Sequence, residues 1–149
     1  MIKETVIDLI EAYGTNDPFE LCKELNIKIM KTDLGNEIKG FFQKISDQCR
    51  IIHINSYLTN YEERYICAHE LGHAIMHSEI SISFFIDNPL QVKNKYELQA
   101  DKFAAELLLP NNLRDFDCDY DFDDLNVEQI CTCLGIPMRL LKYKFDLDI

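Results

Sequence analysis

The chain has 149 residues, 47% hydrophobic and 28% charged, a profile typical of one soluble globular domain. Its net charge of −11 argues against binding to nucleic acid, because Lys and Arg contacts to phosphate dominate that affinity, and it favours a basic protein partner. No apolar run approaches the roughly 20 residues of a membrane helix, and the N-terminus lacks the apolar core of a signal peptide, so we expect a cytoplasmic protein without membrane contact.

The first half of the chain predicts two helices followed by strands. A helix over 2–13 ends at Gly14, and a second starts at Asp17 with Pro18 in its first position. The period then changes to that of β-structure. We expect three strands, over 27–31, 40–45 and 50–55, in a small antiparallel sheet.

The second half is mainly helical by its periodicity. Four helices are predicted, over about 59–77, 95–110, 127–136 and 137–145. Residues 78–93 have no clear period and predict a loop, and 115–124 carry six aspartates. We therefore expect a single α+β domain over 1–149, with a core over about 1–110 and an acidic loop and helix pair over about 111–149.

The stretch HELGHAIMH at 69–77 contains a pattern that can bind a metal. His69 and His73 are four residues apart, so on a helix both rings project from one face and can reach one zinc ion. Glu70 lies beside that face, where it is suited to act as a base for a water molecule. The alternative is two ordinary histidines on an amphipathic helix, and the five residues alone leave both open.

A catalytic zinc site needs a third protein ligand. Glu97 and Asp101 share a face of the next predicted helix, so Glu97 can be a ligand and Asp101 can accept the free ring N–H of a ligand histidine. On spacing alone, Glu97 can also be a capping-box residue after Asn94, although the ligand role is favoured, and Asp101 can be a solvated charge. His77 lies about 12 Å along the helix from His69, too far to share its metal.

Two other features have non-catalytic interpretations. The acidic segment 115–124 and Glu128 have an EF-hand-like spacing, but Phe122 occupies the position that needs glycine, so we expect a solvated loop that docks a basic partner. His53 points away from its Ile neighbours on a predicted strand and is interpreted as structural.

Together these residues resemble the ImmA/IrrE family of zinc metallopeptidases. The resemblance rests on HELGH (69–73), ELQADKFAAELLLP (97–110), GFFQK (40–44) and IIHIN (51–55), and it covers roughly residues 5–110. It implies a gluzincin-like fold with the active site between the two motif helices, zinc as cofactor, His69, His73 and Glu97 as ligands, and Glu70 as the catalytic glutamate.

The same resemblance implies a function and a partner. The expected activity is endopeptidase cleavage of a helix-turn-helix repressor of a phage or mobile element, which relieves repression. The alternative is an anti-repressor that binds its partner without hydrolysis and uses zinc structurally. The residues alone do not select the group that stabilises the oxyanion; Tyr65 and Tyr96 are among the candidates.

Overall fold

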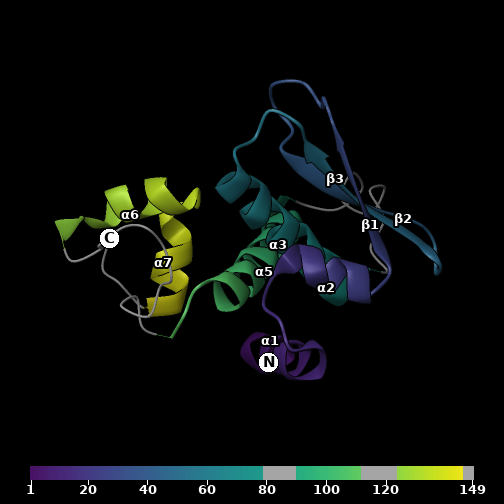
Figure 1. The fold of residues 1–149 in the computed structure, drawn as a ribbon, viewed down its shortest axis with the longest axis horizontal. Helices are drawn as coiled ribbons and strands as arrows, with labels where there is room; N and C mark the ends of the chain where they lie inside the picture. Colours follow the sequence, from purple (N-terminus) through teal and green to yellow (C-terminus); the bar gives the residue numbers. More distant parts are fainter. Residues whose placement is uncertain (79–89, 112–123, 146–149) are drawn as a thin grey trace.

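The computed structural model describes residues 1–78, 90–111 and 124–145, and Figure 1 shows their elements arranged around a central helix pair. In chain order these elements are α1 (Ile2–Tyr13), α2 (Pro18–Glu24), β1 (Ile27–Thr32), β2 (Gly40–Ser46), β3 (Cys49–Asn55), α3 (Asn60–Met76), α5 (Leu90–Leu108), α6 (Val127–Leu134) and α7 (Met138–Phe145). The α+β class predicted from the sequence is confirmed. None of the described helices has the length and apolarity that a membrane crossing needs.

The sheet is mixed rather than antiparallel throughout. Its order is β1-β3-β2, in which β2 and β3 form the expected antiparallel hairpin but β1 runs parallel to β3. The prediction was wrong for β1. Each strand does run opposite to the one before it in the chain, but β3 lies between β1 and β2, so β1 pairs with β3, which runs in the same direction. This order leaves β2 as an edge strand.

The short helices before the sheet begin and end where the sequence predicts. Gly14 adopts the left-handed conformation (φ 71°) that ends α1, and the Asp17 side chain accepts a hydrogen bond from the Phe19 N–H to cap α2. Such helix ends depend on only a few adjacent residues, so they can be predicted from the sequence.

The α3 and α5 helices cross closely at a glycine. A Cβ atom on Gly72 would lie 3.1 Å from side-chain atoms of Phe103, which is fully buried. The glycine inside HELGH therefore has a packing role, since it lets α5 approach the helix that carries the two histidines.

Helix α5 begins at Leu90, earlier than predicted. Asn94 lies inside the helix, so the interpretation of Glu97 as a capping-box residue is wrong, and so is the predicted loop for residues 90–93. Residues 90–93 contain no glycine or proline, so the helix can continue on the N-terminal side of Asn94. The rest of that predicted loop lies outside the described residues.

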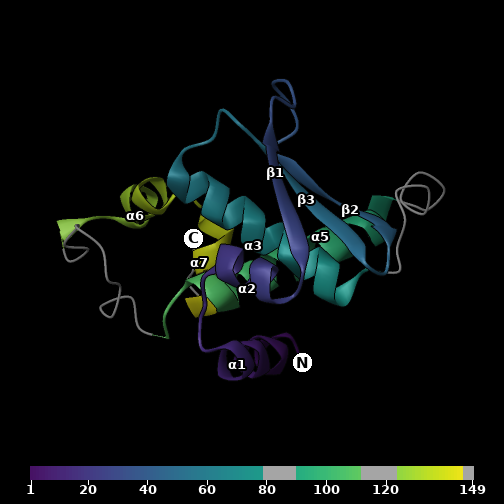
Figure 2. The same ribbon diagram turned by 45° about the vertical axis from the view of Figure 1, so that its right-hand side comes forward.

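The C-terminal helix pair packs at the other end of the central helices from the sheet, as Figures 1 and 2 show. Helix α6 has a capping box between Asn126 and Gln129 and ends at Gly135, which is left-handed (φ 65°). Leu140 and Leu141 of α7 are fully buried. The acidic segment predicted to dock a partner lies, apart from Asp124, outside the described residues.

Candidate metal centre

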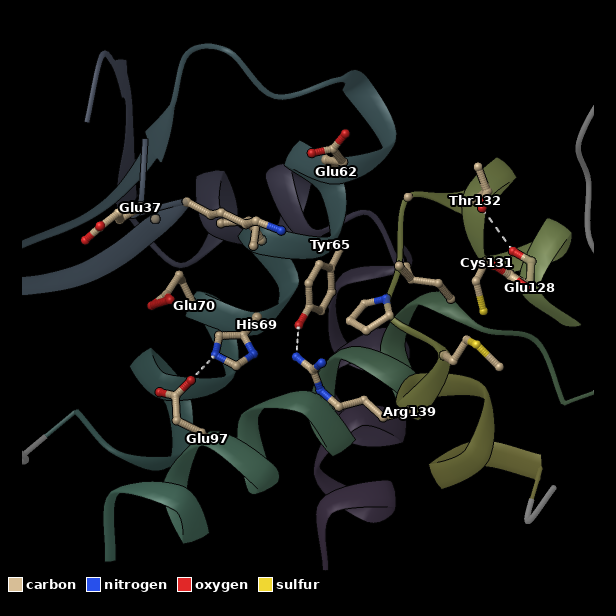
Figure 3. A pocket seen from close by; sticks show the side chains of 17 residues that line it. Glu37, Glu62, Tyr65, His69, Glu70, Glu97, Glu128, Cys131, Thr132 and Arg139 are labelled. Carbon is tan, nitrogen blue, oxygen red and sulfur yellow. Dashed lines mark hydrogen bonds and ion pairs between the residues drawn. The ribbon is translucent and has the colours of Figure 1, made fainter. Parts of the chain in front are cut away.

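Two histidines of α3 and a glutamate of α5 converge in the structure. His69 Nε2 lies 3.1 Å from Glu97 Oε2, and His73 Nε2 lies 2.9 Å from Glu97 Oε1. Both rings are buried, while the Glu97 side chain is 48% exposed. The two helices therefore bring two ring nitrogens and one carboxylate to one point. Figure 3 shows the contact between His69 and Glu97.

The His69 ring is oriented by a buried carboxylate. Its Nδ1 lies 2.8 Å from Asp101 Oδ1, which also accepts a 2.8 Å hydrogen bond from the Tyr65 hydroxyl. The other oxygen, Asp101 Oδ2, accepts a 2.6 Å hydrogen bond from Arg139 Nε. Because a carboxylate can only accept here, His69 carries its proton on Nδ1 and turns Nε2 toward Glu97.

The His73 ring is oriented by another histidine. His77 Nε2 lies 2.7 Å from Gln99 Oε1, and His77 Nδ1 lies 3.0 Å from His73 Nδ1. The amide oxygen of Gln99 accepts, so His77 donates from Nε2 and accepts at Nδ1. His73 then donates from Nδ1, which leaves the lone pair of its Nε2 facing Glu97.

This donor set fits a metal cation. Two ring nitrogens with lone pairs face one carboxylate, and only a cation or added protons can make that arrangement favourable. Burial by itself would lower the pKa of His69, but hydrogen bonds to Asp101 and Glu97 outweigh it and raise the pKa to about 10. Burial opposes ionisation of Glu97 too, yet the hydrogen bonds from His69 and His73 hold its pKa well below the usual range.

Glu70 is a second carboxylate beside this point. Ligand atoms of His69, Glu70 and His73 all lie within 4.8 Å of one another. Burial raises the pKa of Glu70 above its ordinary value, although the charges of the neighbouring His69 and His73, and then a hydrogen bond with the Phe42 backbone, oppose that rise. Glu97, rather than Glu70, contacts the Nε2 atoms of both rings, so the geometry favours Glu97 as the third ligand and leaves Glu70 beside the site.

A cavity of about 770 Å³ opens above these residues. The sheet side contributes Glu37, Lys39 and Gly40, and the C-terminal helices contribute Cys131, Pro137 and Arg139 among others. In Figure 3 the two walls face each other across His69 and Glu70. Gly40, the first residue of β2, is the part of that strand that lines the cavity.

The structure brings together all five residues that the sequence singled out: His69, Glu70, His73, Glu97 and Asp101. His53 stacks on Phe41 and hydrogen-bonds Gln43, away from this group.

Three contacts of the site were not anticipated. His77 contacts His73, Gln99 contacts His77, and Arg139 donates a hydrogen bond to Asp101. The spacing of His77 from His73, again four residues, was a signal that the two rings meet. Nothing in the sequence pointed to Arg139, which lies 38 residues after Asp101.

Comparison with known proteins adds an independent line of evidence. Residues 22–117 match the peptidase M78 family, described as the IrrE N-terminal-like domain. The chain is 34% identical over 145 residues to "Metallopeptidase ImmA" of Bacillus subtilis (strain 168), covering 96% of this chain and 83% of that protein. It is 35% identical over 144 residues to "Uncharacterized immunity region protein 2" of Bacillus phage phi105, covering 97% and 89%. With its cluster of His69, His73 and Glu97 across two helices, the chain belongs to the ImmA/IrrE family of metallopeptidases.

Proposed function

We propose that this protein is a zinc-dependent endopeptidase that acts in the cytoplasm on one specific protein. The observation that carries the proposal is the pairing of two carboxylates with different surroundings. Glu97 contacts both histidine rings, whereas Glu70 is held beside them at the floor of the cleft. A metal site used only for structure has no need of the second carboxylate or of an open cleft.

The residues present would divide the work as follows. His69, His73 and Glu97 would hold the zinc ion, which when bound would act as a Lewis acid on the scissile carbonyl and lower the pKa of a water molecule. Glu70 accepts a proton from the attacking water and delivers it to the leaving amine nitrogen. Asp101 keeps the His69 ring in the orientation that turns Nε2 to the metal.

The hydroxyl of Tyr65 does not suit the role of oxyanion donor in this arrangement. Its hydrogen is directed to Asp101, and burial together with the Asp101 charge raises its pKa. We therefore assign Tyr65 to the orientation of Asp101 and not to the stabilisation of the oxyanion.

The substrate proposal rests on the edge strand. Among the residues that the structure describes, strand β2 pairs with β3 on one side only, and its first residue, Gly40, lines the cleft. An extended peptide that adds to this edge would pass over Glu70 and His69. The names of the relatives, an immunity-region protein and a metallopeptidase, support a helix-turn-helix repressor as substrate, and the net charge of −11 suits a basic partner.

The test is co-expression with a helix-turn-helix protein, which the family resemblance leads us to expect in the neighbouring gene, followed by mass spectrometry of the fragments. The wild type should cut this protein at one site, and Glu70→Gln should retain zinc but leave the repressor intact. Glu11→Gln, which neutralises an exposed carboxylate of α1 outside the cleft lining, is the matched control and should still cut. Wild-type cleavage by Glu70→Gln would refute the mechanism. Relief of repression by Glu70→Gln without cleavage would instead favour a non-hydrolytic anti-repressor with a structural zinc.

A further inference from the structure

Arg139 connects the C-terminal helix pair to the metal centre. It lies on α7, outside residues 22–117 that match the family, and its side chain is half-exposed in the wall of the cleft. Its Nε donates to Asp101 Oδ2 at 2.6 Å. Its Nη2 donates to the Tyr65 hydroxyl at 3.1 Å, the contact that Figure 3 shows. One guanidinium thus contacts both groups that surround the His69 Nδ1.

The position of Arg139 is set by close packing on either side of it in the chain. A Cβ atom on Gly135 would lie 2.8 Å from the Glu62 backbone N, so α6 ends directly against the start of α3. Lys144 forms a 2.8 Å ion pair with Glu106, and Leu140 and Leu141 are fully buried. The guanidinium is therefore held by a docked helix and not by a loose tail.

The charge of Arg139 meets a specific need of Asp101. This carboxylate is 4% exposed, and its other donors among the described residues, His69 and Tyr65, are both directed to Oδ1. A buried carboxylate is costly without a cationic or multiply hydrogen-bonding partner. Arg139 supplies the positive charge and occupies Oδ2, which prevents the carboxylate from rotating away from the His69 ring.

We propose that Arg139 is a positioning residue of the metal centre: it holds Asp101, and through it the His69 ring, so that α7 is a required part of the active site. This inference rests on the proposed function to the extent that His69 is taken as a zinc ligand. It does not require that the protein hydrolyse its partner.

The experiment measures the affinity of the purified full-length chain for Zn²⁺ by competition with a chromophoric chelator. Loss of a group that orients a ligand histidine typically weakens metal binding about 10- to 100-fold, and Arg139 acts one residue further out, so Arg139→Met should weaken it about 3- to 10-fold. Arg139→Lys keeps the charge but lacks the planar fork, and should restore only part of the affinity. Lys142→Met on the same helix loses the same charge and should bind Zn²⁺ like the wild type.

The direction of the change in Zn²⁺ affinity distinguishes a positioning role of Arg139 from a purely electrostatic one. Removing a positive charge near a divalent cation reduces repulsion, so a purely electrostatic role predicts that Arg139→Met binds Zn²⁺ more tightly. Positioning predicts weaker binding and also predicts that the effect disappears when Asp101 is already replaced. In an Asp101→Asn background, Arg139→Met should therefore cause no further loss.

Unchanged or tighter Zn²⁺ binding by Arg139→Met would overturn the proposal, as would an equal loss with and without Asp101. Circular dichroism checks that each variant is folded; if Arg139→Met does not fold, the partial loss expected of Arg139→Lys decides the question. A wild-type protein that binds Zn²⁺ but cuts no repressor would refute the proposed function while leaving this affinity test intact. A wild-type protein that cuts its repressor while Arg139→Met keeps full affinity would refute the positioning role alone.

Discussion

Replacing His77 by Phe tests whether the orientation of His73 matters for metal binding. His77 is buried and provides the acceptor for the His73 Nδ1–H at 3.0 Å. Phenylalanine fills similar space but accepts no hydrogen bond, so the buried donor loses its partner and the ring of His73 is free to turn. Loss of such an orienting partner costs about 10- to 100-fold in metal affinity, which corresponds to about 1.4–2.7 kcal/mol.

The same change should also affect folding without metal. A buried donor left unsatisfied costs about 1–3 kcal/mol, so urea denaturation of the metal-free protein should show a free energy of unfolding lowered by about that amount. His77→Asn, which retains a side-chain acceptor, should lose less Zn²⁺ affinity than His77→Phe.

His53→Phe is the matched control for this series. His53 stacks on Phe41 in the sheet and contacts none of the described residues of the metal centre, so its replacement should leave Zn²⁺ affinity unchanged. Wild-type Zn²⁺ affinity in His77→Phe, measured by chelator competition, would refute the argument that the His77–Gln99 pair orients His73.

Three further outcomes follow from the geometry. Gly40→Ala would place a Cβ atom 2.5 Å from Ile66 Cγ2 and 2.7 Å from the His53 carbonyl oxygen, so β2 should shift from α3; we expect about 1–3 kcal/mol lower stability in urea and reduced cleavage with zinc content retained. Cleavage at the wild-type rate would show that β2 does not align the substrate. Glu97→Gln should lower the zinc content of dialysed protein, measured by mass spectrometry of the metal, and a full equivalent of zinc would exclude Glu97 as a ligand. Zinc at about 1,000 times its dissociation constant should stabilise the metal-free protein by about 4 kcal/mol in calorimetry, and an unchanged melting temperature would argue against a metal site.

Much of the site could be predicted from the sequence, because its residues are grouped by their spacing along helices. His69 and His73 share a face of α3 since they are four residues apart, and Glu97 and Asp101 do so on α5. These relations hold on any regular helix, whatever the rest of the chain does. The predicted start of α2 at Asp17 was confirmed for the same reason.

The start of α5 shows where such local reasoning stops. Asn94 followed by Glu97 satisfies the rule for a capping box, but the helix begins at Leu90 and both residues lie inside it. The choice between cap and ligand for Glu97 depended on where the helix begins and on how α5 crosses α3, and neither is encoded in the three-residue spacing.

The sequence by itself determined which residues have metal-binding chemistry and which helices carry them, because side-chain type and helical period are local properties. Only the tertiary structure decided that β3 lies between β1 and β2, that His77 orients His73, and that Arg139 of α7 holds Asp101. These contacts join segments through packing, and packing depends on the shapes of many surfaces at once. The route from the C-terminal helix to His69 therefore appears only when the chain is folded.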